Sequence, residues 1–350
     1  MPRRPHHFFV PVSVTAETTG LWTTLLNRAE TFRDLAPWTY LDGSSLFGVR
    51  DSDAGAIDWC SVMGQNDEVS GVAIYSGEVG VASLLDILSD GTDELDSKLQ
   101  QAAQVLTFND RADIGRDMVA VLKAIGKRYR GSLTWPELLT HEPGYYPMPP
   151  RDEPTLRRLI STLEGLCAMC AQARMQPGWD SADASGAHWL MTIDGPGSGS
   201  LSREHLPQPA KPAMPTVVID EVAVARIEKK GRERSGPILI DWFAGDGVID
   251  GPEAQDRPYY VMHRLIINTD GLVAAAELSP YGTIWPDMAR MVLAYCETHG
   301  VPQLLIVRRA EAVPVLGPLA ARVGCGIVCR PDTAQVIHHI RDSLSAALGR

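Results

Sequence analysis

The sequence predicts an α/β protein made of two domains, and three observations lead to this prediction. Short apolar runs that are typical of strands alternate with segments of helical period. One stretch rich in Gly, Ser and Pro divides the chain. A length of 350 residues also exceeds what one hydrophobic core usually organises. We therefore expect an α+β domain over residues 1–194, a linker over 195–215 and an α/β domain over 216–350.

The first domain is expected to contain an antiparallel meander. Its strands are predicted at residues 45–49, 56–63 and 69–75, because breaks rich in Asp, Gly and Asn separate these apolar runs. A second group of segments has the apolar spacing of helices that cover a sheet. These predicted helices span residues 21–32, 80–88, 93–105, 116–126 and 154–175.

The stretch from Gly195 to Pro215 carries no hydrophobic period. Its first half is rich in Gly and Ser, which favours a flexible chain, and its second half has prolines at short intervals, which favours an extended one. We therefore expect this segment to link the two domains without secondary structure of its own.

Several short motifs in the N-terminal half carry a family resemblance. They are Pro37-Trp38, Leu46-Phe47-Gly48-Val49, Val62-Met63-Gly64, Gly71-Val72-Ala73-Ile74-Tyr75-Ser76-Gly77 and Pro143-Gly144-Tyr145. In these motifs the chain resembles an uncharacterised family of bacterial proteins, in which a linker joins such a domain to a second one. The resemblance covers most of both halves. It implies no known activity, because the motifs are turn and packing signals.

Four aromatic side chains in or beside these motifs are candidate binding residues. Trp38, Tyr75, Tyr145 and Tyr146 would make the chain a small-molecule or peptide binder if they lined a pocket. The alternative is an aromatic core with a Pro- and Tyr-rich loop packed on it, which is the commoner use of large aromatic residues. Both interpretations stay open at the level of sequence.

The C-terminal half is expected to form a mixed sheet flanked by helices. Apolar runs at 217–219 and 238–242 come first, and residues 259–268 and 273–278 form a hairpin around an Asp-Gly turn. Helix and strand then alternate, which is typical of a sheet with helices packed on it. The alternating segments are helix 286–299, strand 304–307, helix 313–323, strand 326–329 and helix 333–347.

This order of elements resembles the ribonuclease H-like fold. Enzymes of that fold hold two divalent ions between carboxylates on the first strand, the fourth strand and the last helix, for phosphoryl transfer. Asp241, at the end of an apolar run, matches the first position. Arg308 and Arg309 stand where the fourth-strand carboxylate belongs, and the last helix has Asp342 but no early glutamate. The resemblance therefore implies the fold without its complete metal site.

From this pattern we expect a binding or interaction protein without catalytic activity. Arg308 and Arg309 are candidate binding residues. Because buried guanidinium groups need partners, at least one of them should pair with a local acid such as Asp241. The alternative is a metal-dependent nuclease or phosphotransferase with an atypical carboxylate set of Asp241, Asp246 and Asp342.

Composition narrows the partners that we expect. A formal net charge of −11 disfavours nucleic acid, whose affinity for proteins comes largely from Lys and Arg. The sequence has no run of about 18 uncharged apolar residues and no signal peptide, so we expect a cytoplasmic protein that does not enter a membrane. Cys167 and Cys170 have metal-like spacing, but they lie in a helical run without further ligands nearby. We expect a protein or a small molecule as partner, and no metal or cofactor.

Overall fold

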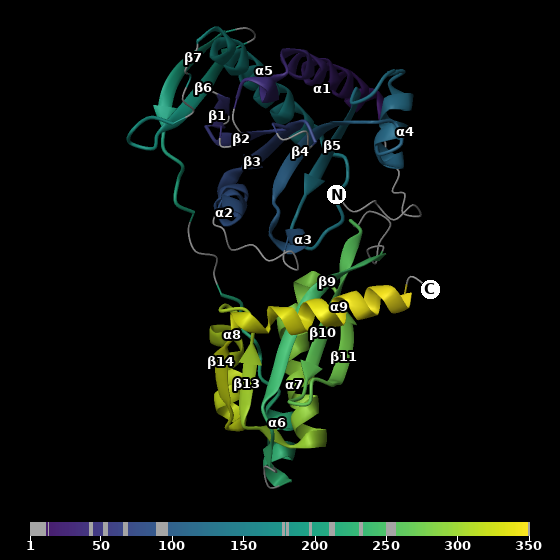
Figure 1. Cartoon of the computed structure of the whole chain (residues 1–350), viewed down its shortest axis with the longest axis vertical. Helices are drawn as coiled ribbons and strands as arrows, with labels where there is room; N and C mark the ends of the chain where they lie inside the picture. The colour runs from purple at the N-terminus through teal and green to yellow at the C-terminus, as the bar shows by residue number, and fades with distance from the viewer. Residues whose placement is uncertain are drawn as a thin grey trace. The chain divides into compact units, whose positions relative to one another are not determined.

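The computed structural model contains helices together with sheets of parallel and antiparallel strands, as the predicted α/β class requires (Figure 1). It describes residues 12, 14–41, 45–51, 55–65, 69–88, 97–176, 179, 182–195, 198–209, 214–230, 234–249 and 257–348. The chain divides into two compact units, which are described one at a time. Unit 1 combines Met1–Thr92, Gln100–Pro143 and Pro147–Ala210, and unit 2 combines Asp93–Leu99, Gly144–Tyr146 and Lys211–Arg350.

The described strands of unit 1 form one seven-stranded sheet with the order β5-β4-β3-β2-β1-β6-β7. Neighbours from β5 to β1 are antiparallel, β6 runs parallel to β1, and β7 returns antiparallel to β6. The expected meander is therefore confirmed as β1, β2 and β3. The strands are β1 (Leu46–Asp51), β2 (Ile57–Met63), β3 (Gly71–Ser76), β4 (Ala103–Asn109), β5 (Trp135–His141), β6 (His188–Gly195) and β7 (Ser198–Glu204).

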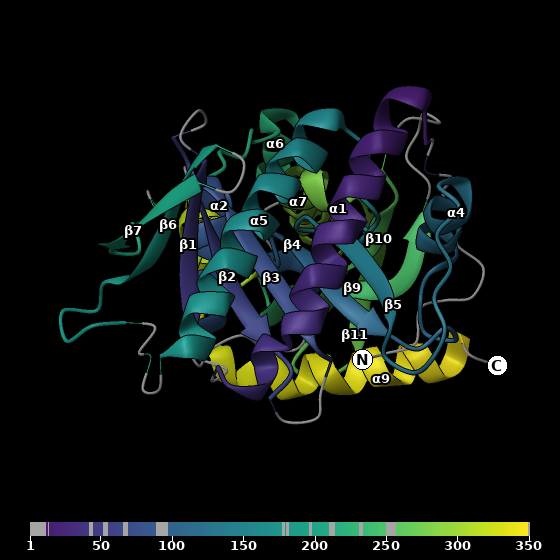
Figure 2. The same ribbon diagram turned by 90° about the horizontal axis from the view of Figure 1, so that it is seen from above.

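Helices cover both faces of this sheet. On one face α1 (Ala16–Leu35) and α5 (Glu153–Met175) lie side by side across the strands (Figure 2), and Phe32 and Leu166 are part of the core that they form. On the other face α2 (Gly77–Leu88) packs on a smaller core that contains Trp59. A further helix of this unit is α4 (Arg116–Ala124), whereas the short helix α3 (Ser97–Gln100) belongs to unit 2 except for its last residue.

Local capping signals begin the two long helices. The hydroxyl of Thr15 accepts a hydrogen bond from the backbone N–H of Thr18, and the Thr18 hydroxyl accepts one from the N–H of Thr15, which is a reciprocal cap at the start of α1. The carboxylate of Asp152 accepts the N–H of Thr155 at the start of α5. These bonds satisfy backbone donors that have no partner inside the helix.

Two expectations for the first half are corrected. The helix predicted over 93–105 is wrong at its end, because residues 103–105 belong to β4, where side chains alternate between the two core clusters. The expected linker over 195–215 is wrong for residues 198–204, which form β7. This edge strand is mostly exposed and is held by its backbone pairing with β6. Its Ser- and Gly-rich sequence therefore lacks the alternation of apolar and polar residues that predicts a strand.

The sheet of unit 2 has five described strands in the order β11-β10-β9-β13-β14. Its first three strands form an antiparallel meander, whereas β13 runs parallel to β9 and β14 runs parallel to β13. A short parallel pair joins β8 (Arg234–Ser235) to β12 (Val301–Pro302). The five strands are β9 (Ile238–Ile249), β10 (Tyr259–Ile267), β11 (Val273–Ser279), β13 (Leu304–Val307) and β14 (Gly326–Cys329).

Helices also cover both faces of the second sheet. Three helices share the larger core with one face, and they are α6 (Glu221–Lys229), α7 (Ile284–His299) and α8 (Ala312–Val323). The last helix, α9 (Ala334–Leu348), covers the opposite face, where Ile337 packs with Leu239 and Phe243. The apolar run at 217–219 has no regular structure, although Val217 and Ile219 pack against the larger core. Among the described helices, none combines the length and apolar character needed to cross a bilayer.

The close packing of β3 against β4 at Gly71 can be tested by substitution. A Cβ at this position of β3 would overlap the backbone carbonyl oxygen of Leu106 on β4, whereas a Cβ at Gly20 of α1 would meet nothing within 4 Å. We predict that Gly71→Ala destabilises the protein by about 1–3 kcal/mol, because the strands must separate. The matched variant Gly20→Ala should be neutral or stabilising by up to about 1 kcal/mol. Thermal unfolding followed by circular dichroism measures both, and equal midpoints would refute this packing.

Candidate functional site

Asp241 lies in the middle of unit 2, on β9. Side chains alternate along this strand, so Leu239 and Phe243 face α9 whereas Ile240 and Trp242 lie in the core shared with α7. The Asp241 side chain therefore belongs to the face that α9 covers, and the residue is only 1% exposed. A carboxylate at such a depth requires charged or hydrogen-bonding partners.

Those partners are the two arginines that follow β13. The Nε atom of Arg308 donates a hydrogen bond of 2.6 Å to Oδ2 of Asp241, and Nη1 of Arg309 donates to Oδ1. Both arginines are buried. The expected pairing of at least one arginine with Asp241 is thus confirmed, and in fact both pair with it. We call Asp241, Arg308 and Arg309 the Asp–Arg cluster.

Trp242 completes the surroundings of Arg309. Its carbonyl oxygen accepts a hydrogen bond of 2.8 Å from Nη2 of Arg309, and the guanidinium carbon lies 4.2 Å from the centroid of its ring. Its backbone N–H in turn donates to Oδ1 of Asp241 at 2.8 Å. One carboxylate, one carbonyl oxygen and one aromatic ring thus stabilise a guanidinium that is almost removed from water.

The Asp–Arg cluster is suited to holding strands together and unsuited to binding a divalent ion. Both oxygens of Asp241 already accept hydrogen bonds from guanidinium groups. Two fixed positive charges beside a carboxylate repel a metal cation, and one carboxylate cannot supply the several oxygen ligands that Mg²⁺ needs. Within the described part of the chain, no group of three or more His, Cys, Asp or Glu side chains could hold a metal ion.

Of the other two carboxylates of the alternative metal site, only that of Asp342 lies in the described part of the structure. Asp342 lies on α9 with its side chain 69% exposed, and it accepts a hydrogen bond from its neighbour Arg341. Asp246 lies on β9, but its side chain is outside the described part of the structure. Asp241 and Asp342 therefore have different environments and share no partner.

The four candidate aromatic residues are divided between the two units. In unit 1, Trp38 packs against Phe108 in the core under α1 and α5, whereas Tyr75 belongs to the core under α2, on the other face of the sheet. Tyr145 and Tyr146 belong to unit 2. Trp38 and Tyr75 thus pack in cores on opposite faces of the sheet and do not line one cavity together, whereas a binding role for the four aromatic residues stays a prediction.

Tyr145 and Tyr146 lie beside β10. Tyr145 forms a bridge with Tyr259 and is exposed, whereas Tyr146 is buried and its ring meets that of Tyr260 edge to face. Arg257 lies over the Tyr145 ring at 5.6 Å. This segment extends the sheet edge through backbone pairing.

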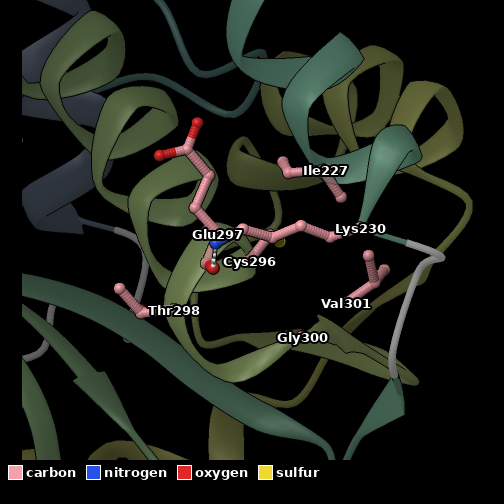
Figure 3. Close-up of a pocket in the computed structure, with 7 residues that line it drawn as sticks. All are labelled: Ile227, Lys230, Cys296, Glu297, Thr298, Gly300 and Val301. Carbon is pink, nitrogen blue, oxygen red and sulfur yellow. Dashed lines mark hydrogen bonds between the residues drawn. The ribbon is translucent and has the colours of Figure 1, made fainter.

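One pocket lies on unit 2 beside α6 and the end of α7, and it contains none of the candidate residues (Figure 3). It is lined by Ile227, Lys230, Cys296, Glu297, Thr298, Gly300 and Val301. Its volume of about 140 Å³ is below the range of sites for drug-sized ligands, and the Lys230 ammonium donates to the Glu297 carbonyl oxygen across it. Burial raises the pKa of the Cys296 thiol to about 12, which keeps it protonated and unreactive near neutral pH.

Arg264 is a buried charged residue that the sequence patterns do not single out. It is 1% exposed and lies on β10 between Met262 and Ile266, which are core residues of the same face. Its Nη2 atom donates to Glu277 at 3.1 Å and to the carbonyl oxygen of Leu278. The signal that could have found it is a lone arginine at an apolar position of a period-two strand.

The comparisons with known proteins concern mainly unit 1. A family described as "Domain of unknown function (DUF7309)" matches residues 22–191, which is just under half of the chain. Neither the curated proteins nor the solved structures returned a match. The matched span agrees with an uncharacterised N-terminal domain and contains no residue of the Asp–Arg cluster.

The stability of unit 2 should depend on Asp241. Asp241→Leu leaves two buried guanidinium groups without their carboxylate, so we predict a loss of about 3–5 kcal/mol in the free energy of unfolding. The control Glu228→Gln removes an exposed partner of Arg322 and should cost less than about 1 kcal/mol. Urea-induced unfolding measures both.

A triple variant separates a structural role from simple loss of packing. Asp241→Leu combined with Arg308→Met and Arg309→Leu removes all three charges together. Most of the stability lost in the single variant should return, because no buried charge remains unpaired. A triple variant as unstable as Asp241→Leu would contradict the assignment.

Proposed function

We propose that the chain is a non-catalytic binding or interaction protein whose C-terminal unit is a degenerate ribonuclease H-like domain. The observation that carries the proposal is the Asp–Arg cluster. At the position where enzymes of that fold hold a metal ion, Asp241 is instead bonded to Arg308 and Arg309.

The topology of unit 2 supports the fold assignment. Three leading antiparallel strands are followed by strands β13 and β14, which alternate with helices α7, α8 and α9. This is the order of elements on which the resemblance rests. Asp241 lies on the first strand of the sheet, and Arg308 directly follows the fourth.

The residues of unit 2 do not fit the metal pair that the resemblance implies. A divalent ion at Asp241 would displace two guanidinium donors and leave them buried without a carboxylate partner, which is costly. The fourth strand supplies cations where an acid is needed, so the carboxylates that would clamp the attacking and leaving oxygens are missing there. We therefore derive no phosphoryl-transfer step for this chain.

Metal titration tests this proposal. We predict that calorimetric titration of Mg²⁺ or Mn²⁺ into the whole protein gives no saturable binding, and that Asp241→Asn gives the same heats. Incubation with single- or double-stranded nucleic acid and either ion should give no hydrolysis that depends on Asp241. Metal binding or hydrolysis by the wild type that disappears in Asp241→Asn would show that the arginines do not block a site.

A further inference from the structure

Unit 1 carries a group of exposed cations in a chain of net charge −11. Its members are Arg111, Arg116, Lys123, Arg128 and Arg130, all of them exposed, and we call them the cationic surface. None forms an ion pair with another residue in the described part of the chain. Four of the five are arginines, whose planar groups bind carboxylates through two parallel hydrogen bonds.

Helix α4 presents two of these cations on one side. Arg116 and Lys123 are seven residues apart, so they lie on the same side of the helix at a rise of about 10 Å. The opposite side of α4 is anchored in the core through Met118, Val121 and Leu122. The acid in its first turn, Asp117, is buried and accepts a backbone N–H, so it does not neutralise the exposed side.

The segment after α4 contributes two more residues to the cationic surface, because half-buried and exposed side chains alternate along it. Lys127 and Tyr129 point to α1, where the ammonium and the hydroxyl bind Glu30 at 2.6 Å and 2.7 Å. Arg128 and Arg130, which alternate with them, are exposed. The anchors on Glu30 therefore fix the backbone while the two guanidinium groups stay available.

Leu133 adds an exposed apolar group to the same stretch of chain. Its side chain is 54% exposed and its backbone has φ +53°, a left-handed conformation that is costly for a residue with a Cβ. The carboxylate of Asp110 holds this turn by accepting the N–H of Leu133 at 2.8 Å and the hydroxyl of Ser132 at 2.7 Å. These hydrogen bonds also lower the pKa of Asp110, which keeps the carboxylate charged.

Contacts join Arg111 to Tyr129, which lies between Arg128 and Arg130 in the chain. The guanidinium of Arg111 lies 5.2 Å from the ring centroid of Trp135, and that ring lies 5.8 Å from the ring of Tyr129. Leu133 is two residues from Trp135 along the chain, and Arg130 is three residues from Leu133. An exposed leucine in a strained conformation thus follows Arg128 and Arg130 in the chain by a few residues.

We infer that the cationic surface binds an acidic segment of a partner protein and that Leu133 contacts an apolar side chain of that segment. The arginines match carboxylates in charge and geometry, and a leucine matches an apolar neighbour. The inference rests on unit 1 alone and does not depend on the role of Asp241.

Two observations favour an acidic peptide over nucleic acid. A net charge of −11 repels a long polyanion wherever it leaves the cationic surface, whereas a short segment experiences only the local charge within about 8 Å. The aromatic rings here are also engaged, since Arg111 lies over Trp135 and the Tyr129 hydroxyl binds Glu30, which leaves them poorly placed to stack on bases.

Fluorescence anisotropy with the full chain tests the charges. The probe is a short fluorescein-labelled peptide of alternating Glu and Leu residues at low ionic strength. Arg128→Glu with Arg130→Glu should weaken its binding by about ten-fold. The control pair Arg157→Glu with Arg226→Glu changes the net charge equally at arginines that are each 64% exposed, and it should change the affinity by less than about two-fold.

A second variant tests Leu133 without damaging the fold. Asn tolerates the left-handed conformation better than Leu, so Leu133→Asn should keep or raise the unfolding midpoint while weakening peptide binding by about five-fold. Four results would overturn the inference: no binding by the wild type, equal loss in the control pair, unchanged affinity of Leu133→Asn, or tighter binding of an oligothymidylate of equal charge.

Discussion

The buried contact of one carboxylate with two guanidinium groups is the interaction on which unit 2 depends. Asp241, Arg308 and Arg309 bring three charges into an interior where an unpaired charge is not tolerated. They carry one net positive charge, which the Trp242 carbonyl oxygen, its ring and the nearby Glu311 carboxylate stabilise. The cluster joins β9 to the turn after β13, so it fixes the parallel part of the sheet where the fold changes from hairpins to alternating helices and strands.

Buried charges that need partners also occur in the core on the α7 side of the sheet. Trp242, which contacts Arg309, also meets Trp285 edge to face and stands opposite Arg264 in the ladder between β9 and β10. Arg264 is in turn held by Glu277, which also binds Arg290. Two buried arginines with separate partners therefore border one tryptophan. Such polar groups permit few alternative packings, because any shift of register would leave a buried charge unpaired.

Strongly patterned elements could be predicted from the sequence, and weakly patterned ones could not. The meander of β1, β2 and β3 and the alternation after β11 follow from apolar runs separated by turn residues. β7 was missed because an edge strand of Ser and Gly is held by backbone pairing alone. The Asp–Arg cluster was predictable because arginines after a buried strand need an acid. The separation of Trp38 from Tyr75 was not, since a buried aromatic residue has the same sequence signature on either face of a sheet.

The central claim is that the Asp241 carboxylate serves two arginines and no metal ion. The most direct measurement is a crystal structure of the protein soaked in Mn²⁺, with anomalous scattering used to locate the metal. The account predicts no anomalous peak within about 2.5 Å of the Asp241 oxygens, and both guanidinium groups bonded to them. A manganese peak on Asp241, with Arg308 or Arg309 turned away from the carboxylate, would contradict it.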